Sequence, residues 1–169
     1  SSAVFCPDQE LPHRENAHKS PSSPYAAAKL ACEGYCAAYH KCYGLDVKVA
    51  RLFNVYGVGM RRFAIYDFYQ KIRRDSASLE ILGDGFQVRD YLYIDDLVEG
   101  LAVIATRGQS GEDYNLSSGV PTTSLDLARQ VAAIMGCPDI EITFKGASFP
   151  GDVPRWYADI DKVQGLGFS

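Results

Sequence analysis

The 169-residue sequence has no surplus of positive charge and no long hydrophobic run. Its 17 Lys and Arg residues are outnumbered by 21 Asp and Glu residues, and the net charge of −4 provides no field that attracts nucleic acid or anionic lipid. No segment reaches the roughly 18 consecutive apolar residues that a membrane-spanning helix needs. We therefore expect neither nucleic acid nor a membrane among the partners of this protein.

Histidine, cysteine and targeting signals are also scarce. The three histidines and five cysteines form no cluster with the short spacing of a zinc site, so we expect no metal. The cysteine count is odd, and Cys32 and Cys36 lie one helical turn apart in a segment rich in Ala and Tyr. This pattern argues against a disulfide framework and for thiols packed as small core residues. Because no secretion signal opens the sequence, we expect a cytoplasmic location.

An initiating methionine is missing as well. The chain begins at Ser1, and the apolar run that ends at Phe5 indicates the end of a buried strand. The chain ends at Ser169, directly after a helical pattern. We expect it to be part of a larger whole, completed by a preceding half of the same protein or by a second chain.

What is present is an alternation of helical and extended patterns, which predicts an α/β fold. The polar, proline-rich residues 7–24 indicate a surface loop. Ser23 as N-cap, Pro24 in the first turn and Gly44 as the stop predict a helix over residues 24–43. The other expected elements are helices over residues 62–74, 96–106 (with Asp95 as N-cap) and 124–135, strands over 46–53, 79–82, 88–93 and 140–144, and a loop over 54–60.

Tyr25 and Lys29 lie four residues apart on the predicted helix 24–43. This spacing places the phenol and the ammonium on one helix face, where the positive charge favours the phenolate. Such a pair can act as a general acid and base, and a hydroxyl of Ser1 or Ser2 could hydrogen bond the same substrate oxygen. The spacing is also common on helices that carry no chemistry, so the pair alone leaves both interpretations open.

An ordered series of motifs surrounds this pair: Ser-Ser-Ala-Val-Phe at residues 1–5, Ser-Pro-Tyr-Ala-Ala-Ala-Lys at 23–29, Val-Ala-Arg-Leu-Phe-Asn-Val-Tyr-Gly at 49–57, Gly-Asp-Gly-Phe-Gln-Val-Arg-Asp-Tyr at 83–91 and Pro-Gly-Asp-Val-Pro-Arg-Trp-Tyr at 150–157. Together they resemble the extended short-chain dehydrogenase/reductase family. More narrowly, they are similar to its NAD-dependent nucleotide-sugar epimerases and dehydratases, with the UDP-glucose 4-epimerase pattern nearest. The resemblance covers nearly the whole chain and the C-terminal half of a family member.

The resemblance implies both the architecture and the cofactor. Residues 1–54 would form the C-terminal part of a Rossmann-type, doubly wound sheet that binds NAD and carries the catalytic helix. Residues 55–169 would mainly form a small α/β subdomain that binds the nucleotide sugar, with some segments returning to the Rossmann domain. The Gly-rich turn with which family members hold the dinucleotide pyrophosphate has no counterpart here.

The resemblance also implies roles for individual residues. Ser1, four residues before Phe5, matches the catalytic hydroxyl residue, and Ser2 is the alternative. Tyr25 matches the catalytic acid and base, and Lys29 the residue that holds the nicotinamide ribose. The remaining assignments are Leu52 and Phe53 at the cofactor, together with Tyr25 and Lys29, and Asn54, Glu80, Leu82, Arg89, Asp152, Arg155 and Trp156 at the substrate.

Two departures from the family pattern bear on the reaction and the substrate. Dehydratases of the family carry Asp-Glu directly after the catalytic hydroxyl residue, where this chain has Ser2 and Ala3, and this argues against dehydration and decarboxylation. Phe149 stands where the family often has Arg, which makes Arg155 a candidate substitute. Trp156 occupies the position that bounds the 2-substituent of the sugar, and its size favours glucose or galactose over an N-acetyl sugar, although a buried structural role is the alternative.

The resulting expectation is a NAD-dependent UDP-hexose 4-epimerase that acts through a 4-keto sugar and forms a homodimer. One alternative is another reductase, epimerase or dehydratase of the same family. The other is a catalytically silent fragment that associates through the apolar face of helix 24–43.

Overall fold

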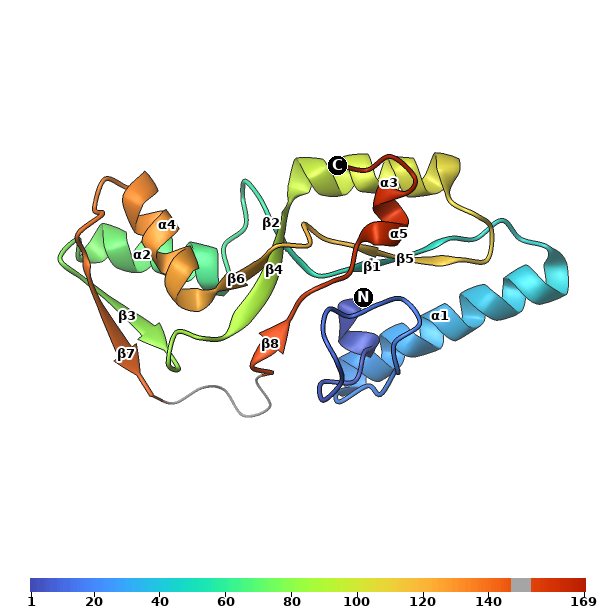
Figure 1. Ribbon diagram of the computed structural model, residues 1–169, viewed down its shortest axis with the longest axis horizontal. Helices are drawn as coiled ribbons and strands as arrows, with labels where there is room; N and C mark the ends of the chain where they lie inside the picture. Colours follow the sequence, from blue (N-terminus) through green and yellow to red (C-terminus); the bar gives the residue numbers. More distant parts are fainter. Residues whose placement is uncertain (147–152) are drawn as a thin grey trace. The chain divides into compact units, whose positions relative to one another are not determined.

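The computed structural model describes residues 1–146 and 153–169 of the chain. The described residues belong to two compact units (Figure 1). Unit 1 comprises Ser1–Val55, Asp90–Val120 and Trp156–Ser169, and unit 2 comprises Tyr56–Arg89 and Pro121–Arg155. The expectations for Asp152 and Phe149 lie outside the described residues.

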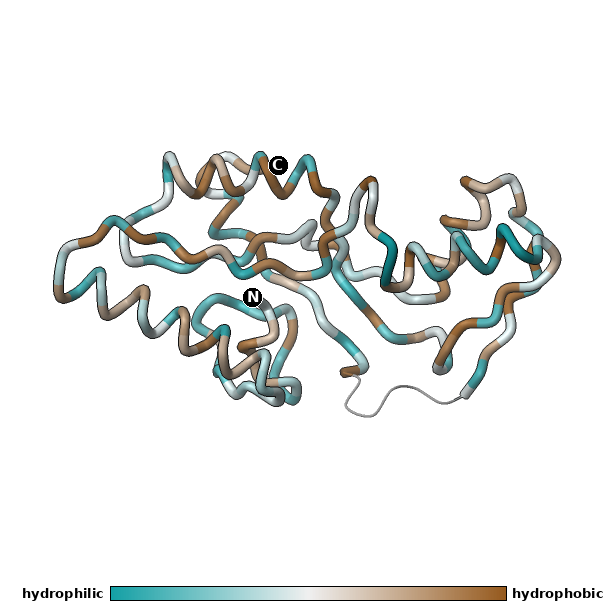
Figure 2. The backbone as a smooth tube through the Cα atoms, turned by 180° about the vertical axis from the view of Figure 1, so that it is seen from behind, coloured by the Kyte–Doolittle hydropathy of each residue, from teal (hydrophilic) through white to brown (hydrophobic). Residues whose placement is uncertain are grey.

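Unit 1 is built on two parallel strands that are distant in sequence. Strand β1 (Val49–Leu52) pairs with β5 (Asp113–Leu116), with Val49 opposite Asp113 and Leu52 opposite Leu116. Leu97, Val103 and Ile104 form part of the core with Leu116, and hydrophobic residues recur along helix α3, which carries the first three (Figure 2). The helical elements of this unit are η1 (Ser2–Val4, a 3-10 helix), α1 (Pro24–Tyr43), α3 (Ile94–Arg107) and α5 (Asp161–Gln164).

Unit 2 also contains a parallel strand pair. Strand β3 (Ser78–Leu82) pairs with β7 (Glu141–Lys145), and its side chains alternate, with Leu79 and Ile81 buried and Glu80 exposed. Helices α2 (Phe63–Arg74) and α4 (Ser124–Ile134) contribute further buried side chains, which are Phe68, Ile72, Leu127, Ala128 and Ala132.

The remaining strands form one further sheet. Its order is β2 (Asn54–Tyr56), β4 (Val88–Tyr93) and β6 (Pro121–Thr123), and the short strand β8 (Arg155–Trp156) pairs with β4. Across residues 1–146 and 153–169, we find no helix with the length and apolarity needed to cross a membrane.

Helix α1 has the bounds that its capping residues predict. Ser23 Oγ accepts a hydrogen bond of 3.1 Å from the backbone N–H of Ala26, and Pro24 occupies the first turn. Gly44 ends the helix in the left-handed conformation, with φ of 66°, which glycine adopts without steric cost.

The expected strand end at residues 1–5 is wrong. Turn-type hydrogen bonds fold this segment into η1: Ser1 Oγ accepts from the N–H of Ala3 at 3.4 Å, and the N–H of Phe5 donates to the carbonyl of Ser2 at 3.1 Å. Val4 and Phe5 are nevertheless fully buried, as their apolar character predicts.

Two other local expectations are also corrected. Asp95 is not an N-cap: α3 begins at Ile94, two residues before the expected start at residue 96. Asp95 therefore lies in the first turn, where the positive end of the helix dipole stabilises its negative charge. The expected loop 54–60 begins with strand β2, because Asn54–Tyr56 pairs with β4.

Candidate active site

The first two turns of α1 present Tyr25 and Lys29 on one face, as their spacing predicts. The Lys29 ammonium lies 5.6 Å from the centroid of the Tyr25 ring. Tyr25 is 59% exposed, so its phenol is open to a ligand.

The segment that begins at Ser1 packs against the same helix. Element η1 contacts α1, and one apolar cluster joins Val4 and Phe5 to Leu30 of α1 and to Phe53, the residue after β1. Ser2 is buried, whereas Ser1 is half-buried. The cluster therefore brings the Ser1 segment, the helix that carries Tyr25 and the end of β1 into one region of unit 1.

Three of the predicted residues lie where β1 ends and β2 begins. Leu52 is half-buried, Phe53 is buried, and the Asn54 side chain donates a hydrogen bond of 3.2 Å to the carbonyl oxygen of Asp90. The fully buried Asp90 carboxylate itself accepts four hydrogen bonds, from the backbone N–H and hydroxyl of Ser118 and from the N–H groups of Gly119 and Ala158. Asp90 thus organises the loop that follows β5.

Arg51 is an anchor of this region that sequence reasoning missed. Its guanidinium is fully buried and donates to both oxygens of Glu33 on α1, from Nε at 3.0 Å and from Nη2 at 2.9 Å. It also donates to the carbonyl of Glu15 at 2.8 Å and forms an ion pair with Asp113 of β5. The sequence did contain a signal, because Arg51 is a charged residue inside the apolar β run 49–53. An arginine buried in a strand needs carboxylate or carbonyl partners, so its position indicated an ion pair.

His13 is a second buried polar residue that the motifs did not single out. It lies in the proline-rich loop, and its ring packs between Phe5 and Trp156, with centroid distances of 5.0 Å and 4.4 Å. Burial lowers the pKa of His13 from 6.5 to about 4, because the charged imidazolium would lose its hydration there. Trp156 is half-buried and packs on the cluster that holds Phe53.

The other predicted substrate residues lie in unit 2. Glu80 is exposed and its carboxylate forms an ion pair of 3.8 Å with Lys145, while its carbonyl accepts from Lys71 at 3.0 Å. Leu82 is 38% exposed. Arg89 is half-buried and donates to the carbonyl of Val88 at 2.8 Å, and Arg155 is exposed at the start of β8.

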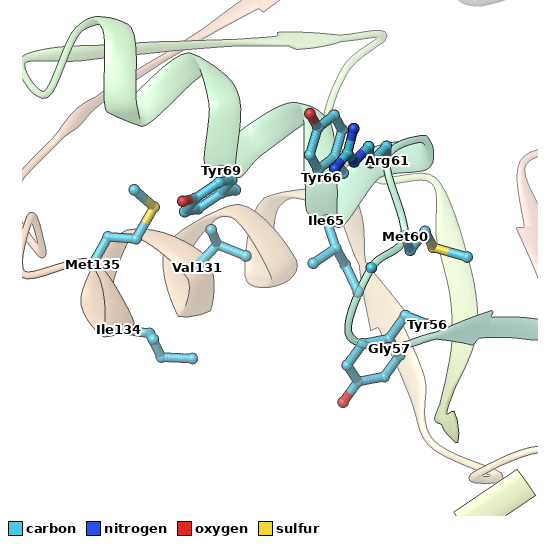
Figure 3. Close-up of a pocket in the computed structure, with 11 residues that line it drawn as sticks. Tyr56, Gly57, Met60, Arg61, Ile65, Tyr66, Tyr69, Val131, Ile134 and Met135 are labelled. Atoms are coloured by element: carbon cyan, nitrogen blue, oxygen red, sulfur yellow. The ribbon is translucent and has the colours of Figure 1, made fainter. Parts of the chain in front are cut away.

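Unit 2 also has an apolar groove of about 450 Å³ that the sequence did not suggest. Figure 3 shows Tyr69 of α2, Val131 of α4 and Met135, the residue that follows α4, facing the same space. The other lining residues are Tyr56, Gly57, Gly59, Met60, Arg61, Ile65, Tyr66 and Ile134. None of the predicted substrate residues that the structure describes is among them.

Comparison with known proteins identifies the family to which this arrangement belongs. The model of the NAD dependent epimerase/dehydratase family matches residues 1–117, which hold the Ser1 segment, the Tyr25 and Lys29 pair and the end of β1. The chain belongs to this family. The predicted resemblance is thereby confirmed, and members of the NAD dependent epimerase/dehydratase family are enzymes that use NAD.

Individual relatives include both dehydratases and epimerases. A dTDP-glucose 4,6-dehydratase of Actinoplanes sp. is 32% identical over 150 residues, which are 88% of this chain and 47% of the relative. A solved UDP-N-acetylglucosamine 4-epimerase from Methanobrevibacter ruminantium matches with a TM-score of 0.89 at 30% identity, over 100% of this chain and 55% of that one. A solved UDP-glucose 4-epimerase from Thermotoga maritima matches with a TM-score of 0.88 at 30% identity, over 99% of this chain and 55% of that one.

These matches confirm the predicted fold class, the C-terminal part of a Rossmann-type sheet with a smaller α/β part. The chain spans about half the length of the Actinoplanes relative and of the solved structures. Nucleotide-sugar chemistry is common to these proteins, whereas their reactions differ.

Proposed function

We propose that the protein carrying this chain is a NAD-dependent nucleotide-sugar 4-epimerase that acts on a UDP-hexose. The observation that carries the proposal is the combination of the exposed Tyr25 and Lys29 pair with a Ser1 segment that bears no carboxylate at Ser2 or Ala3. The pair can move a proton at a sugar hydroxyl. The two residues after Ser1 offer no acid for the elimination of water.

In this proposal Tyr25, as phenolate, accepts the proton of the sugar 4-hydroxyl and later returns it. Ser1 Oγ donates a hydrogen bond to the same oxygen and orients it. The Lys29 ammonium group can donate hydrogen bonds to ribose hydroxyls. Because Tyr25 returns the proton that it accepted, its side chain is in the same protonation state before and after each turnover.

The residues around Tyr25 fit the nicotinamide riboside end of NAD. Lys29 offers ammonium donors to hydroxyl groups, and Leu52 and Phe53 offer apolar surface at the end of β1. The chemistry that NAD supplies when bound is the reversible acceptance of a hydride from C4 of the sugar. The pyrophosphate end would need a Gly-rich turn outside these 169 residues, in a preceding part of the same protein or in a second chain.

We assign the nucleotide sugar to the residues that the family pattern indicates. Asn54 and Arg89 would hold the diphosphate, since amide and guanidinium groups donate well to phosphate oxygens. Glu80 and Leu82 would flank the base, Asp152 and Arg155 the ribose and phosphate, and Trp156 the sugar.

A dehydratase is the main competing assignment, because the Actinoplanes relative is one. Elimination of water needs a proton donor for the leaving hydroxyl in addition to the tyrosine. Glu33 is a carboxylate on α1, but both of its oxygens accept hydrogen bonds from Arg51. Identity near 32% supports the shared fold and leaves the reaction to the site residues.

Product analysis distinguishes the two reactions. The protein expressed from its complete reading frame is incubated with UDP-glucose and NAD, and the products are resolved by NMR. We expect UDP-galactose with no change in mass. A product lighter by one water molecule would identify a dehydratase and overturn the assignment, and the absence of turnover on any nucleotide sugar would favour a silent fragment.

A further inference from the structure

Three aromatic rings join the Ser1 segment to Trp156 through His13. The His13 ring lies parallel to the Phe5 ring, with an interplanar angle of 7°. The His13 ring also meets the Trp156 ring at an interplanar angle of 61°, in an edge-to-face arrangement that aromatic rings favour. Phe5 lies four residues after Ser1, so the stack connects the predicted catalytic hydroxyl with the residue predicted to bound the sugar.

The backbone of His13 is fixed to the same segment as its ring. Its N–H donates to the carbonyl of Tyr157 at 3.0 Å, and its carbonyl accepts from the N–H of Asp159 at 2.9 Å and from the Asn115 side chain at 2.8 Å. Two of these bonds are made to residues 157 and 159, directly after Trp156, and they tie this segment to the proline-rich loop. The position of the indole therefore depends on where His13 sits.

The His13 ring has one polar contact in the part of the chain that the structure describes. The Gln9 amide nitrogen donates to Nδ1 at 3.1 Å, which places the hydrogen of the neutral ring on Nε2. Nε2 is buried and has no hydrogen-bond partner among the described residues.

We propose that His13 is a positioning residue: it holds the Trp156 indole against the Ser1 segment and thereby sets the space for the 2-substituent of the sugar. The proposal rests on the proposed function, because it assigns Trp156 to the sugar. His13 is fully buried and touches no substrate atom in this account. Its effect on the reaction is transmitted by Trp156.

The fluorescence of Trp156 tests the positioning without any activity, because Trp156 is the single tryptophan of the 169-residue chain. His13→Leu keeps the site apolar but removes the ring, and His13→Phe keeps a ring of similar size. We expect His13→Leu to shift the emission to longer wavelength and to raise acrylamide quenching at least twofold, while His13→Phe stays near the wild type. Far-UV circular dichroism checks that both variants fold.

The positioning is overturned if folded His13→Leu has the emission and quenching of the wild type. Should His13→Leu fail to fold, His13→Asn and His13→Phe give the same comparison, and equal emission from these two variants would equally contradict the proposal.

Substrate selectivity tests the consequence in the protein expressed from its complete reading frame. The ratio of kcat/KM for UDP-glucose to that for UDP-N-acetylglucosamine should fall at least tenfold in His13→Leu and less than threefold in His13→Phe. An unchanged ratio, with shifted emission, would overturn the role in selectivity. If the wild type acts on no nucleotide sugar, the proposed function fails, whereas a shifted emission still supports the positioning of Trp156.

Discussion

Arg51 and His13 illustrate two ways in which the interior of unit 1 accommodates a basic side chain. The carboxylates of Glu33 and Asp113 balance the charge of the buried Arg51 guanidinium, and the carbonyl of Glu15 accepts a further N–H. Among the residues that the structure describes, no carboxylate pairs with His13; burial lowers the pKa of His13 to about 4, so it is neutral at pH 7. The family resemblance assigns a catalytic role to neither residue.

Removing the Arg51 guanidinium should destabilise the protein strongly. Arg51→Leu leaves Glu33 and Asp113 without their buried partner, and breaking a buried ion pair costs about 3–5 kcal/mol. The matched control is Arg14→Leu, because Arg14 is 70% exposed in its 3.1 Å pair with Asp159, and exposed pairs contribute about 0–1 kcal/mol. Urea unfolding measures both, and equal losses would contradict the anchoring role of Arg51.

His13 should make the stability depend on pH between about 4 and 6.5. Its pKa is lower in the folded state than in the unfolded state, so the unfolded chain binds the proton first as the pH falls. Stability is therefore complete above pH 6.5 and falls toward pH 4, by about 2 kcal/mol between pH 7 and pH 5. His13→Phe should remove this part of the pH dependence in urea unfolding, and an identical pH profile in the two proteins would contradict it.

At the scale of elements, the sequence predicted those whose ends are coded locally. The bounds of α1 follow from Ser23, Pro24 and Gly44, which act within a few residues of each helix end. Strand β5 was not predicted, because it exists by pairing with β1, which is more than 60 residues away in sequence. The two-residue strand β8 and the three-residue strand β2 likewise depend on pairing with β4.

Loss of the α1 N-cap should destabilise the first turn of α1, which carries Tyr25. Ser23→Ala removes the acceptor for the N–H of Ala26, one residue after Tyr25, and such caps contribute about 1 kcal/mol. Ser22→Ala is the matched control, because Ser22 is exposed and caps no helix. Thermal unfolding should show the lower midpoint for Ser23→Ala alone, and the same shift for Ser22→Ala would argue against a capping effect.

At the scale of the whole molecule, the candidate site was predicted by motif resemblance rather than by periodicity. In unit 1 the structure explains why the predicted site residues lie near one another, because one apolar cluster joins the Ser1 segment, α1 and Phe53. The groove of unit 2 was missed because its lining comes from three separate segments, which no local pattern connects. The homodimer and the roles of the substrate residues stay predictions.

The measurement that tests the central claim most directly is epimerase turnover by a Tyr25→Phe variant. The protein expressed from its complete reading frame is assayed for conversion of UDP-glucose to UDP-galactose, together with substrate binding by calorimetry. Tyr35→Phe is the control, since Tyr35 is a 70% exposed tyrosine of the same helix. We expect Tyr25→Phe to lower kcat by about 10²–10⁴ with little change in binding, as removal of a general acid and base does. Turnover at the wild-type rate in Tyr25→Phe would contradict the account.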